Sequence, residues 1–361
     1  MKTLAAAAAV VLLAAALPAP ATITVIDVGG HPFMALPAAD GDALFVSVGR
    51  LRKSNGIQVV HRSGDAYTLG QFITIDGDPT GMGLTPDGKT LLVAAGDRYA
   101  ALSASDAEAG GSPHVAYLQD RFVGGAIEVA AGADGRFAFF TDENDASVGV
   151  ARIGAAADGT PTLTSIGRVP VDMAPVGITL SPDGNTLFVT SEVAAGHPRS
   201  CANGRSPGSL ITIDAGTAEL TPEKSVQSSM AAGCSPVRVA LSPDGMRAWV
   251  TQRGDNALAS FDVAAMRAEP DRALRSTIRV GDSPVGLAIV RNGSLAYVAN
   301  SNRFDPSARY STVDVVDLGT GTVVAKYATG KFPRELRESP QHDAVYLTNY
   351  DGGTVEVLPI P

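Results

Sequence analysis

The feature that most constrains the fold of this chain is a unit that recurs roughly every 48 residues. Its clearest copies are Ser/Thr-Pro-Asp-Gly turns at residues 85–88, 181–184 and 242–245, each followed by an apolar stretch. Looser copies complete a set of seven anchors, which are Gly41, Gly88, Gly135, Gly184, Gly245, Gly293 and His342. A repeat of this length indicates one array of units that bury their faces against each other, rather than two or three unrelated domains.

Two further marks accompany the anchors and divide each unit into strands. An aromatic residue follows the anchor in six of the seven copies, at Phe45, Phe139, Phe188, Trp249, Tyr297 and Tyr346, with Leu92 in the second copy. A proline precedes the anchor at Pro32, Pro79, Pro175, Pro236, Pro284 and Pro333, with Ala126 in the third copy. The Asp-Gly turn joins two strands closely, and residues 209–214 and 312–317 alternate with a period of two, as further strands do. The pattern predicts an all-β fold, a seven-bladed β-propeller whose blades are four-stranded antiparallel sheets.

The ends of the chain predict how such a ring closes. The last repeat holds only three strands before the chain stops, whereas residues 22–29 have the pattern of a fourth strand ahead of the first proline mark. We therefore expect this N-terminal strand to complete the seventh blade and to close the ring. Residues 22–361 are predicted to form a single domain, because seven units of the observed length account for them.

The N-terminus has the features of an export signal. Lys2 precedes an apolar run from residue 4 to residue 17, and small residues follow. That run is shorter than the about 20 residues that a membrane span needs, so residues 1–21 are predicted to be a signal peptide of the general secretory route. The expected location is the periplasm or the medium of a bacterium, with no membrane attachment after cleavage. In such an oxidising compartment the only two cysteines, Cys201 and Cys234, are expected to form a disulfide.

The repeat resembles the YVTN-type seven-bladed β-propeller family, which includes YncE-like and lactonase-like propellers. The likeness is carried by residues 174–191, Ala-Pro-Val-Gly-Ile-Thr-Leu-Ser-Pro-Asp-Gly-Asn-Thr-Leu-Phe-Val-Thr-Ser, and by a looser copy at 296–301, Ala-Tyr-Val-Ala-Asn-Ser. It covers nearly the whole chain after the signal. The resemblance implies the propeller fold, but it does not select an activity, because binding modules, lactonase-like enzymes and subunits of redox complexes share this fold.

Propellers bind ligands where the loops of one face surround the central channel, and the sequence places charged residues there. Two positions after the proline mark, glycine recurs in three repeats, but the third, fifth and seventh carry charged residues. Residues 300–311 add further arginines. The residues predicted to line a ligand site at the channel mouth are His31, Asp78, Glu128, Arg238, Arg334 and Glu335. The alternative is a salt-bridged channel lining, in which buried carboxylates only need arginine partners.

A group of acidic residues suggests a second kind of site. Asp142, Glu143 and Asp145 lie in the expected loop between the second and third strands of blade three. Clustered carboxylates suit Ca²⁺, but the spacing of an EF-hand loop is absent, and a solvated acidic loop is the alternative. No other cofactor is predicted. The net charge of −9 argues against general nucleic-acid binding, which requires basic residues to displace counterions.

These patterns favour a binding or scaffold protein over an enzyme, because no reaction can be assigned to named residues. We expect an exported monomer that holds a small polar ligand, a peptide or a partner protein on the loop-rich face of the channel. Two alternatives stay open at this point, a metal-dependent lactonase-like hydrolase and a structural subunit of a periplasmic redox complex. A bound divalent metal would favour the first alternative, and co-purification with a cytochrome or a quinoprotein would favour the second.

Overall fold

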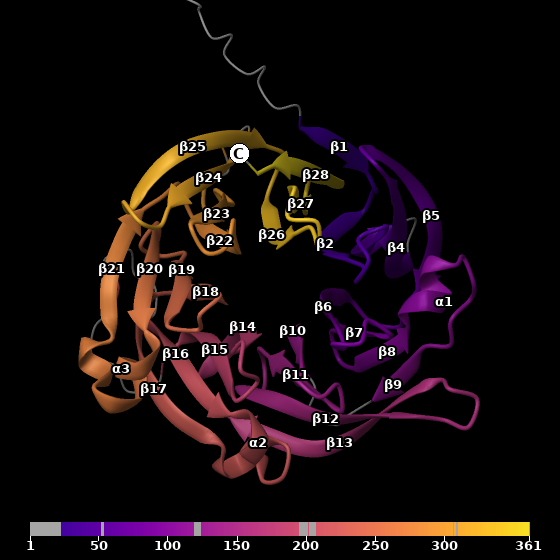
Figure 1. Ribbon diagram of the computed structural model, residues 1–361, viewed down its shortest axis with the longest axis horizontal. Coiled ribbons are helices and arrows are strands. Elements are labelled where there is room, and N and C mark those ends of the chain that lie inside the picture. The colour runs from indigo at the N-terminus through magenta and orange to yellow at the C-terminus, as the bar shows by residue number, and fades with distance from the viewer. Residues whose placement is uncertain are drawn as a thin grey trace, which may run out of the picture.

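The computed structural model describes residues 23–51, 54–118, 124–194, 201, 207–305, 307 and 310–360. Within these ranges the chain forms seven four-stranded antiparallel sheets, arranged as a ring about a central axis (Figure 1). Each sheet is one blade, which confirms the predicted all-β fold with seven blades of four antiparallel strands. The predicted signal peptide, residues 1–21, lies outside the described residues.

The first six blades run from the inside of the ring to its outside in chain order (Figure 1). The first, innermost strands of the seven blades are β2 (His31–Pro37), β6 (Pro79–Leu84), β10 (Ala126–Ala131), β14 (Met173–Leu180), β18 (Pro236–Leu241), β22 (Pro284–Val290) and β26 (Pro333–Glu338). The second strands are β3 (Ala43–Leu51), β7 (Thr90–Ala95), β11 (Phe137–Asp142), β15 (Thr186–Val193), β19 (Arg247–Gln252), β23 (Leu295–Asn300) and β27 (Ala344–Asn349). The third strands are β4 (Ser54–Ser63), β8 (Tyr99–Ser103), β12 (Ser147–Ala155), β16 (Pro207–Asp214), β20 (Ala257–Asp262), β24 (Ser311–Asp317) and β28 (Thr354–Pro359). The outermost strands of the first six blades are β5 (Ala66–Thr74), β9 (Ala116–Leu118), β13 (Pro161–Pro170), β17 (Val226–Cys234), β21 (Leu274–Arg279) and β25 (Thr322–Thr329).

The first and the last described strands of the chain meet in the seventh blade. β1 (Thr24–Asp27) is the outermost strand of the sheet that also contains β28, β27 and β26, and it pairs antiparallel with β28 along its whole length. The side chains of Ile26 and Val28 are buried in one cluster with Val355 of β28. The N-terminal segment therefore covers a strand that would otherwise present an open edge.

The Pro-Asp-Gly turns connect the first and second strands and also join neighbouring blades. In blade four the hydroxyl of Ser181 donates to Asp183 Oδ1 (2.5 Å), which also accepts from the N–H of Asn185 (3.1 Å). Gly184 has the left-handed φ of +75° that this turn requires. A Cβ at Gly184 would lie 2.5 Å from the Cβ of Ala133 in the preceding blade, so glycine is also needed for close contact between the turns.

The same contact explains why proline and glycine recur together in the repeat. A Cβ at Gly245 would lie 3.3 Å from Pro182, and a Cβ at Gly293 would lie 2.7 Å from Pro243. In both cases the proline belongs to the turn of the preceding blade. In these two turns the glycine therefore packs against the proline of the turn before it, and both residue types serve the assembly of the ring.

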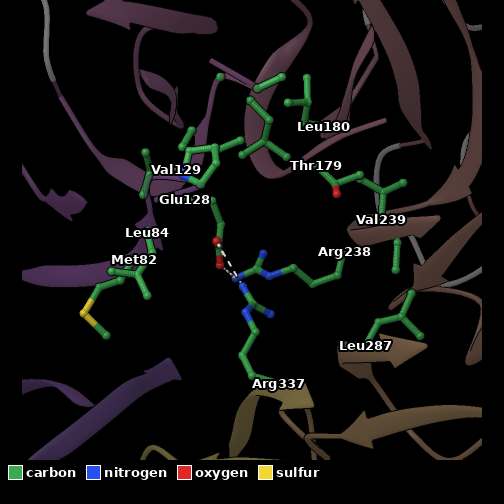
Figure 2. Close-up of a pocket in the computed structure, with 17 residues that line it drawn as sticks. Met82, Leu84, Glu128, Val129, Thr179, Leu180, Arg238, Val239, Leu287 and Arg337 are labelled. Carbon is green, nitrogen blue, oxygen red and sulfur yellow. Dashed lines mark ion pairs between the residues drawn. The ribbon is translucent and has the colours of Figure 1, made fainter. Parts of the chain in front are cut away.

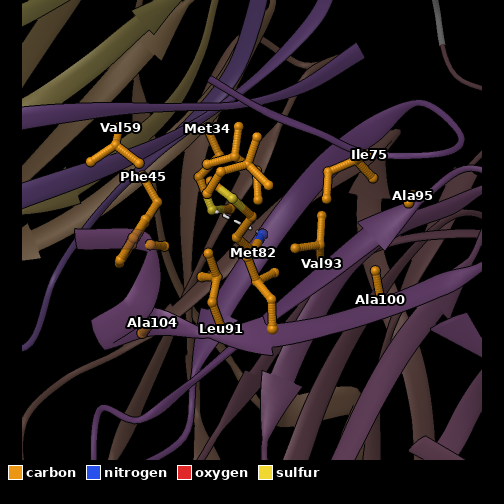
Figure 3. Close-up of a cluster of buried hydrophobic side chains, with 14 of the residues drawn as sticks. Met34, Phe45, Val59, Ile75, Met82, Leu91, Val93, Ala95, Ala100 and Ala104 are labelled. Carbon is orange, nitrogen blue, oxygen red and sulfur yellow. Dashed lines mark hydrogen bonds between the residues drawn. The ribbon is translucent and has the colours of Figure 1, made fainter. Parts of the chain in front are cut away.

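The hydrophobic core lies between blades rather than within one blade. Figure 3 shows the layer between the first two blades, where Met34 and Phe45 of the first pack with Met82 and Val93 of the second. None of these four side chains is more than 2% exposed. All seven residues at the aromatic position of the repeat are likewise buried. Because a blade can bury both faces only between two neighbours, this core requires a closed ring.

The described helices lie on the outside of the ring (Figure 1). They are the short α-helices α1 (Ala104–Glu108), α2 (Ala215–Ala218) and α3 (Val263–Ala268), with 3₁₀ turns at Pro222–Lys224 and Pro270–Arg272. Each α-helix follows a third strand and begins at a side chain that accepts a backbone N–H, from Ser103, Asp214 and Asp262. None of these helices has the length and apolar character that crossing a membrane requires.

Candidate functional site

The seven first strands surround the channel (Figure 1). The two ends of the channel differ in what lies around them. Each first strand begins near the proline mark and ends at the Pro-Asp-Gly turn. The links between blades and the loops after the second strands therefore lie at one end, which we name the mouth. The Pro-Asp-Gly turns lie at the other end, which we name the turn face.

Each first strand contains a bulge near its start, and in blade three this bulge turns a side chain toward the channel. The pairing of β10 with β11 shifts register around Glu128, and a shift occurs at the corresponding place in the other six first strands. The N–H of Glu128 donates to Thr141 Oγ1 (3.0 Å) instead of taking part in the ladder. Bulges commonly re-aim a side chain in this way, and this bulge points Glu128 inward.

In other blades the threonine hydroxyl at the position of Thr141 also ties one blade to the next. Thr251 Oγ1 accepts from the N–H of Arg238 (3.0 Å) and donates to the carbonyl of Val285 in the following blade (2.9 Å). Thr348 makes the equivalent bond to the carbonyl of Phe33 (2.7 Å), across the junction between the last blade and the first. Sequence reasoning missed this position. The sequence does mark it, because a Ser or Thr stands two residues after the aromatic position in five of the seven repeats.

Large and small side chains alternate around the channel at the bulge position. In order around the ring these residues are Met34, Gly81, Glu128, Gly177, Arg238, Gly286 and Glu335. A Cβ at Gly81 would lie 2.8 Å from Cδ of Glu128, and a Cβ at Gly177 would lie 3.2 Å from Cα of Arg238. Each of these glycines makes room for the charged residue of the next blade, so the glycines shape the site as much as the charges do.

The predicted residues Glu128, Arg238 and Glu335 meet inside the channel. Arg238 Nε donates to Glu335 Oε1 (2.5 Å), and Arg238 Nη2 also contacts this oxygen and lies 3.1 Å from Glu128 Oε1. Arg337, which was not predicted, completes the group, with Nη1 3.1 Å from Glu335 Oε2 and Nη2 3.5 Å from Glu128 Oε2. Figure 2 shows Glu128, Arg238 and Arg337 converging from three blades. This central network fits the salt-bridged lining that was the alternative to a ligand site.

The two carboxyl groups of the central network differ in their affinity for protons. Burial and the negative charge of Glu335 raise the pKa of Glu128 to about 8, and the two arginines offset only part of this rise. Burial acts on Glu335 in the same direction, but Arg238 and Arg337 outweigh it and hold the pKa of Glu335 below its usual value. At neutral pH the network therefore contains one carboxylate, one protonated carboxyl and two guanidinium groups, and its net charge is positive.

Arg334 lies next to the central network but faces aromatic rings. Its guanidinium carbon is 4.5 Å from the ring centre of Phe33, 5.3 Å from that of Phe332 and 5.7 Å from that of Tyr350. Burial and the charge of Arg238 lower the pKa of Arg334 to about 10, which leaves the side chain charged at neutral pH. Within the described part of the chain, no hydrogen bond or ion pair satisfies this guanidinium.

Phe332 adopts a strained backbone conformation beside Arg334. Its φ of +54° lies in the left-handed region that bulky residues rarely adopt. The equivalent positions of blades four, five and six also have positive φ, but they hold the small residues Ala174, Ser235 and Ser283. Arg303 adds a second guanidinium 5.7 Å from the Phe332 ring centre. Such backbone outliers concentrate at functional sites. Sequence reasoning missed this one, although an aromatic residue where four of the other repeats have a small residue was a visible signal.

Further charged side chains lie around the mouth at the ends of second strands. Arg253, which follows β19, pairs with Glu192 of β15 (2.5 Å). Burial and the charge of Glu192 raise the pKa of Glu143. The charges of Arg334, Arg303 and Arg253 act to lower it. The charged residues that act on one another here come from blades three to seven and surround one opening.

The predicted disulfide is confirmed and lies at this end of the channel. Cys201 bonds to Cys234, with the two Cα atoms 5.9 Å apart, an ordinary distance for a disulfide. Cys234 is the last residue of β17 and directly precedes the link to β18. The bond therefore anchors part of the long connection between β15 and β16 beside the mouth.

The remaining predicted mouth residues, His31 and Asp78, have different surroundings. His31 Nδ1 lies 3.1 Å from the carbonyl of Tyr350 and 3.6 Å from Asp351 Oδ1, and its ring centre is 4.8 Å from that of Tyr350. It therefore supports the ring that faces Arg334. Asp78 is exposed, and no hydrogen bond or ion pair joins its side chain to the other five within the described ranges.

The acidic residues considered for a metal are grouped around an arginine. Asp142 is fully buried, with Oδ2 2.5 Å from Arg168 Nη2, and Asp145 Oδ2 lies 2.9 Å from the same nitrogen. Where the structure describes the chain, it brings together no group of three or more His, Cys, Asp or Glu side chains that could hold a metal ion. Metal binding and lactonase-like hydrolysis therefore stay predictions.

Similarity to known proteins identifies the fold alone. No family model and no curated protein matches the sequence. The chain is similar to one in a structure of Kuenenia stuttgartiensis hydrazine synthase, with 16% identity, a TM-score of 0.69, and 92% of this chain and 96% of the other covered. It is also similar to a protein of unknown function from Desulfotomaculum acetoxidans, with 13% identity, a TM-score of 0.64, and 90% of this chain and 91% of the other covered. A third similar structure is the β-propeller domain of Myceliophteria thermophila Cps50 (Swd1), with 13% identity, a TM-score of 0.67, and 94% of this chain and 100% of the other covered. These structures support the propeller fold, while membership of the YVTN-type family stays a prediction.

Proposed function

We propose that this protein is an exported β-propeller that binds an anionic ligand at the channel mouth and acts as a binding or scaffold module. The observation that carries the proposal is Arg334, a half-buried guanidinium beside three aromatic rings, without a carboxylate partner among the described residues. Burying a charge is unfavourable unless the charge is paired, and a ligand anion would supply the missing partner.

The surroundings of Arg334 favour an anion over a cation. Arg238 and Arg303 both act to lower the pKa of Arg334, which means that three guanidinium groups repel one another in the free protein. An anion near Arg334 and Arg303 would relieve this repulsion. Guanidinium groups bind carboxylate and phosphate oxygens through paired N–H donors, and the rings of Phe332 and Tyr350 would contact the body of the ligand.

Titration calorimetry with three kinds of anion tests the proposal. The probes are succinate, inorganic phosphate, and a short peptide with either a free or an amidated C-terminus. At least one probe is expected to bind, and Arg334→Gln is expected to weaken it about tenfold or more, because hydrogen bonds to charged groups contribute roughly 1.5–3 kcal/mol. Arg279→Gln, an exposed position on β21, is the matched control and should leave the affinity unchanged. If no probe binds, or if Arg334→Gln binds as tightly as the unaltered protein, the proposal is wrong.

Replacing Phe332 separates a role in binding from a role in packing. Glycine accepts a φ of +54° without the strain that a side chain adds. Phe332→Gly is therefore expected to weaken anion binding while the melting temperature changes little. A large fall in melting temperature with unchanged anion affinity would instead identify the ring as a packing element.

A second candidate function is that of a structural subunit in a larger redox assembly. Outermost strands carry apolar side chains that are 40–59% exposed, namely Val25, Leu69, Val226, Leu274, Val323 and Val324, and exposed apolar surface often marks an interface. One similar solved chain belongs to a structure titled hydrazine synthase. Cross-linking in intact producing cells, followed by mass spectrometry, tests this. Val324→Lys should abolish a specific cross-link at β25 without changing anion binding, whereas recovery of the chain alone would exclude a stable assembly.

A further inference from the structure

A separate cavity lies at the turn-face end of the channel. Its volume is about 420 Å³, within the range of roughly 300–1,000 Å³ that is common for small-molecule sites. Pro86, Gly132 and Ala133, which belong to the turns of blades two and three, are part of its lining. Arg334 is not among the residues that line it, whereas Glu128, Arg238 and Arg337 of the central network are.

The cavity has apolar walls and a charged inner end (Figure 2). The first strands of five blades contribute the walls, with Leu84, Val129, Leu180, Val239 and Leu287. Glu128, Arg238 and Arg337 are the charged side chains in its lining. Apolar walls with a few convergent polar groups are the usual composition of a site for a small amphipathic molecule.

Arg337 has hydrogen-bonding capacity that the protein does not use. Its Nη1 donates to Glu335 Oε2 (3.1 Å) and to the carbonyl of Leu336 (3.0 Å). Its Nη2 lies 3.5 Å from Glu128 Oε2, at the limit of a hydrogen bond, and its Nε has no partner in the described chain. Because a guanidinium carries five N–H donors and this side chain is 29% exposed, an oxygen anion in the cavity can reach free donors.

We propose that this cavity binds a medium-chain monocarboxylic acid, with the carboxylate on Arg337 and the hydrocarbon chain along the apolar walls. The ligand carboxylate would accept from the unused N–H groups of Arg337, and the protonated carboxyl of Glu128 would offer an O–H donor nearby. The net positive charge of the central network at neutral pH favours an anionic head group over an amine. The proposal does not rest on an anion at the mouth, since the two sites share no proposed ligand contact.

Ligand chain length and head group test the two halves of this site separately. Each additional buried methylene is expected to tighten binding about fourfold, so octanoate should bind roughly 15-fold more tightly than hexanoate in titration calorimetry. Octanol and octylamine carry the same hydrocarbon chain, and they are expected to bind about tenfold more weakly than octanoate, or weaker still. Lack of saturable octanoate binding, or equal affinity for all three head groups, would overturn the proposal.

Two variants locate the binding within the molecule. Arg337→Gln removes the head-group contact and is expected to weaken octanoate about tenfold without changing the affinity for octanol. Thr179→Phe places a ring in the cavity from β14 and is expected to weaken both ligands. Arg279→Gln, outside both sites, is the control with unchanged affinity. If Arg337→Gln does not fold, Thr179→Phe decides the matter, and unchanged octanoate binding in that variant overturns the proposal.

Discussion

Replacing Glu128 with glutamine should make the stability of this protein less dependent on pH. The folded protein binds a proton on Glu128 more tightly than the unfolded chain does, because burial and Glu335 raise the pKa of Glu128 from 4.5 to about 8. A group with a raised folded pKa contributes stability that is fully present below its unfolded pKa. That stability is lost as the pH rises through the folded value.

The size of this loss of stability can be worked out for the pH range in which unfolding is measured. One pKa unit corresponds to about 1.4 kcal/mol, so raising the pH from 6 to 9, through the folded pKa of about 8, should remove roughly 3 kcal/mol of unfolding free energy through Glu128. Glu335 has a pKa below its usual value and stays ionised throughout this window. In Glu128→Gln the loss is absent, because the amide does not titrate. Between pH 6 and pH 9 the variant should therefore gain roughly 3 kcal/mol of unfolding free energy relative to the unaltered protein, and it should be the more stable of the two at pH 9.

Trp249 supplies the assay, since it is the only tryptophan of the chain and is buried in the fifth blade. Urea unfolding followed by its fluorescence at pH 6, 7.5 and 9 gives the unfolding free energy of both proteins. The difference between the two cancels the titration of other groups. Glu269→Gln, at an exposed carboxylate paired with Arg272, is the matched control and should follow the unaltered protein at each pH.

Two outcomes would refute this reasoning. If the pH profiles of Glu128→Gln and the unaltered protein run parallel, Glu128 does not change protonation in this range. If the variant is less stable at pH 9, the arginines stabilise the charged form of Glu128 more than burial and Glu335 disfavour it. Either result would also remove the positive charge assigned to the central network at neutral pH.

Three further changes test other parts of the structure. Replacing Cys201 and Cys234 with serine should lower the unfolding free energy by about 3–4 kcal/mol, because the bond closes a loop across a sequence separation of 33; urea unfolding measures the loss, and a change within error would contradict the estimate. Deleting residues 22–27 removes β1 and opens the edge of β28, so the calorimetric melting temperature should fall sharply; an unchanged value would show that the ring is stable without this strand. Arg168→Gln leaves the buried carboxylate of Asp142 unpaired and should cost about 3–5 kcal/mol of unfolding free energy. Adding Asp142→Asn to that variant should recover much of the loss in chemical denaturation, and no recovery would mean that Arg168 acts through other contacts.

The ring could be predicted from the sequence because each unit repeats the same local requirements. The turn keeps a residue with a left-handed backbone conformation even where glycine is replaced, since His342 has a φ of +58°. The aromatic position is buried in all seven blades, including the second, where it is Leu92. Periodic signals of this kind survive the loss of single residues, since six other copies define the position.

The candidate site could be predicted only in part, because its partners come from different blades. The departure from glycine identified Glu128, Arg238 and Glu335, and the structure joins these three. No local pattern distinguishes Arg337, whose contact with Glu128 depends on how two distant strands face each other across the channel. The rings around Arg334 likewise come from the first and last repeats, so their proximity is a product of ring closure.

The number of blades explains why the mouth site lies where it does. Large and small residues can alternate strictly only around an even ring, so a ring of seven must place two residues of the same kind side by side at one junction. Here these are Glu335 of the last blade and Met34 of the first. Met34 turns into the core between blades one and two, where its sulfur accepts from the N–H of Met82 (3.2 Å). Phe33 and Arg334 contact each other across the same junction, with the guanidinium carbon 4.5 Å from the ring centre. The unmatched arginine therefore lies at the one place where the alternation has to break, and a ligand anion there would complete the packing of the ring.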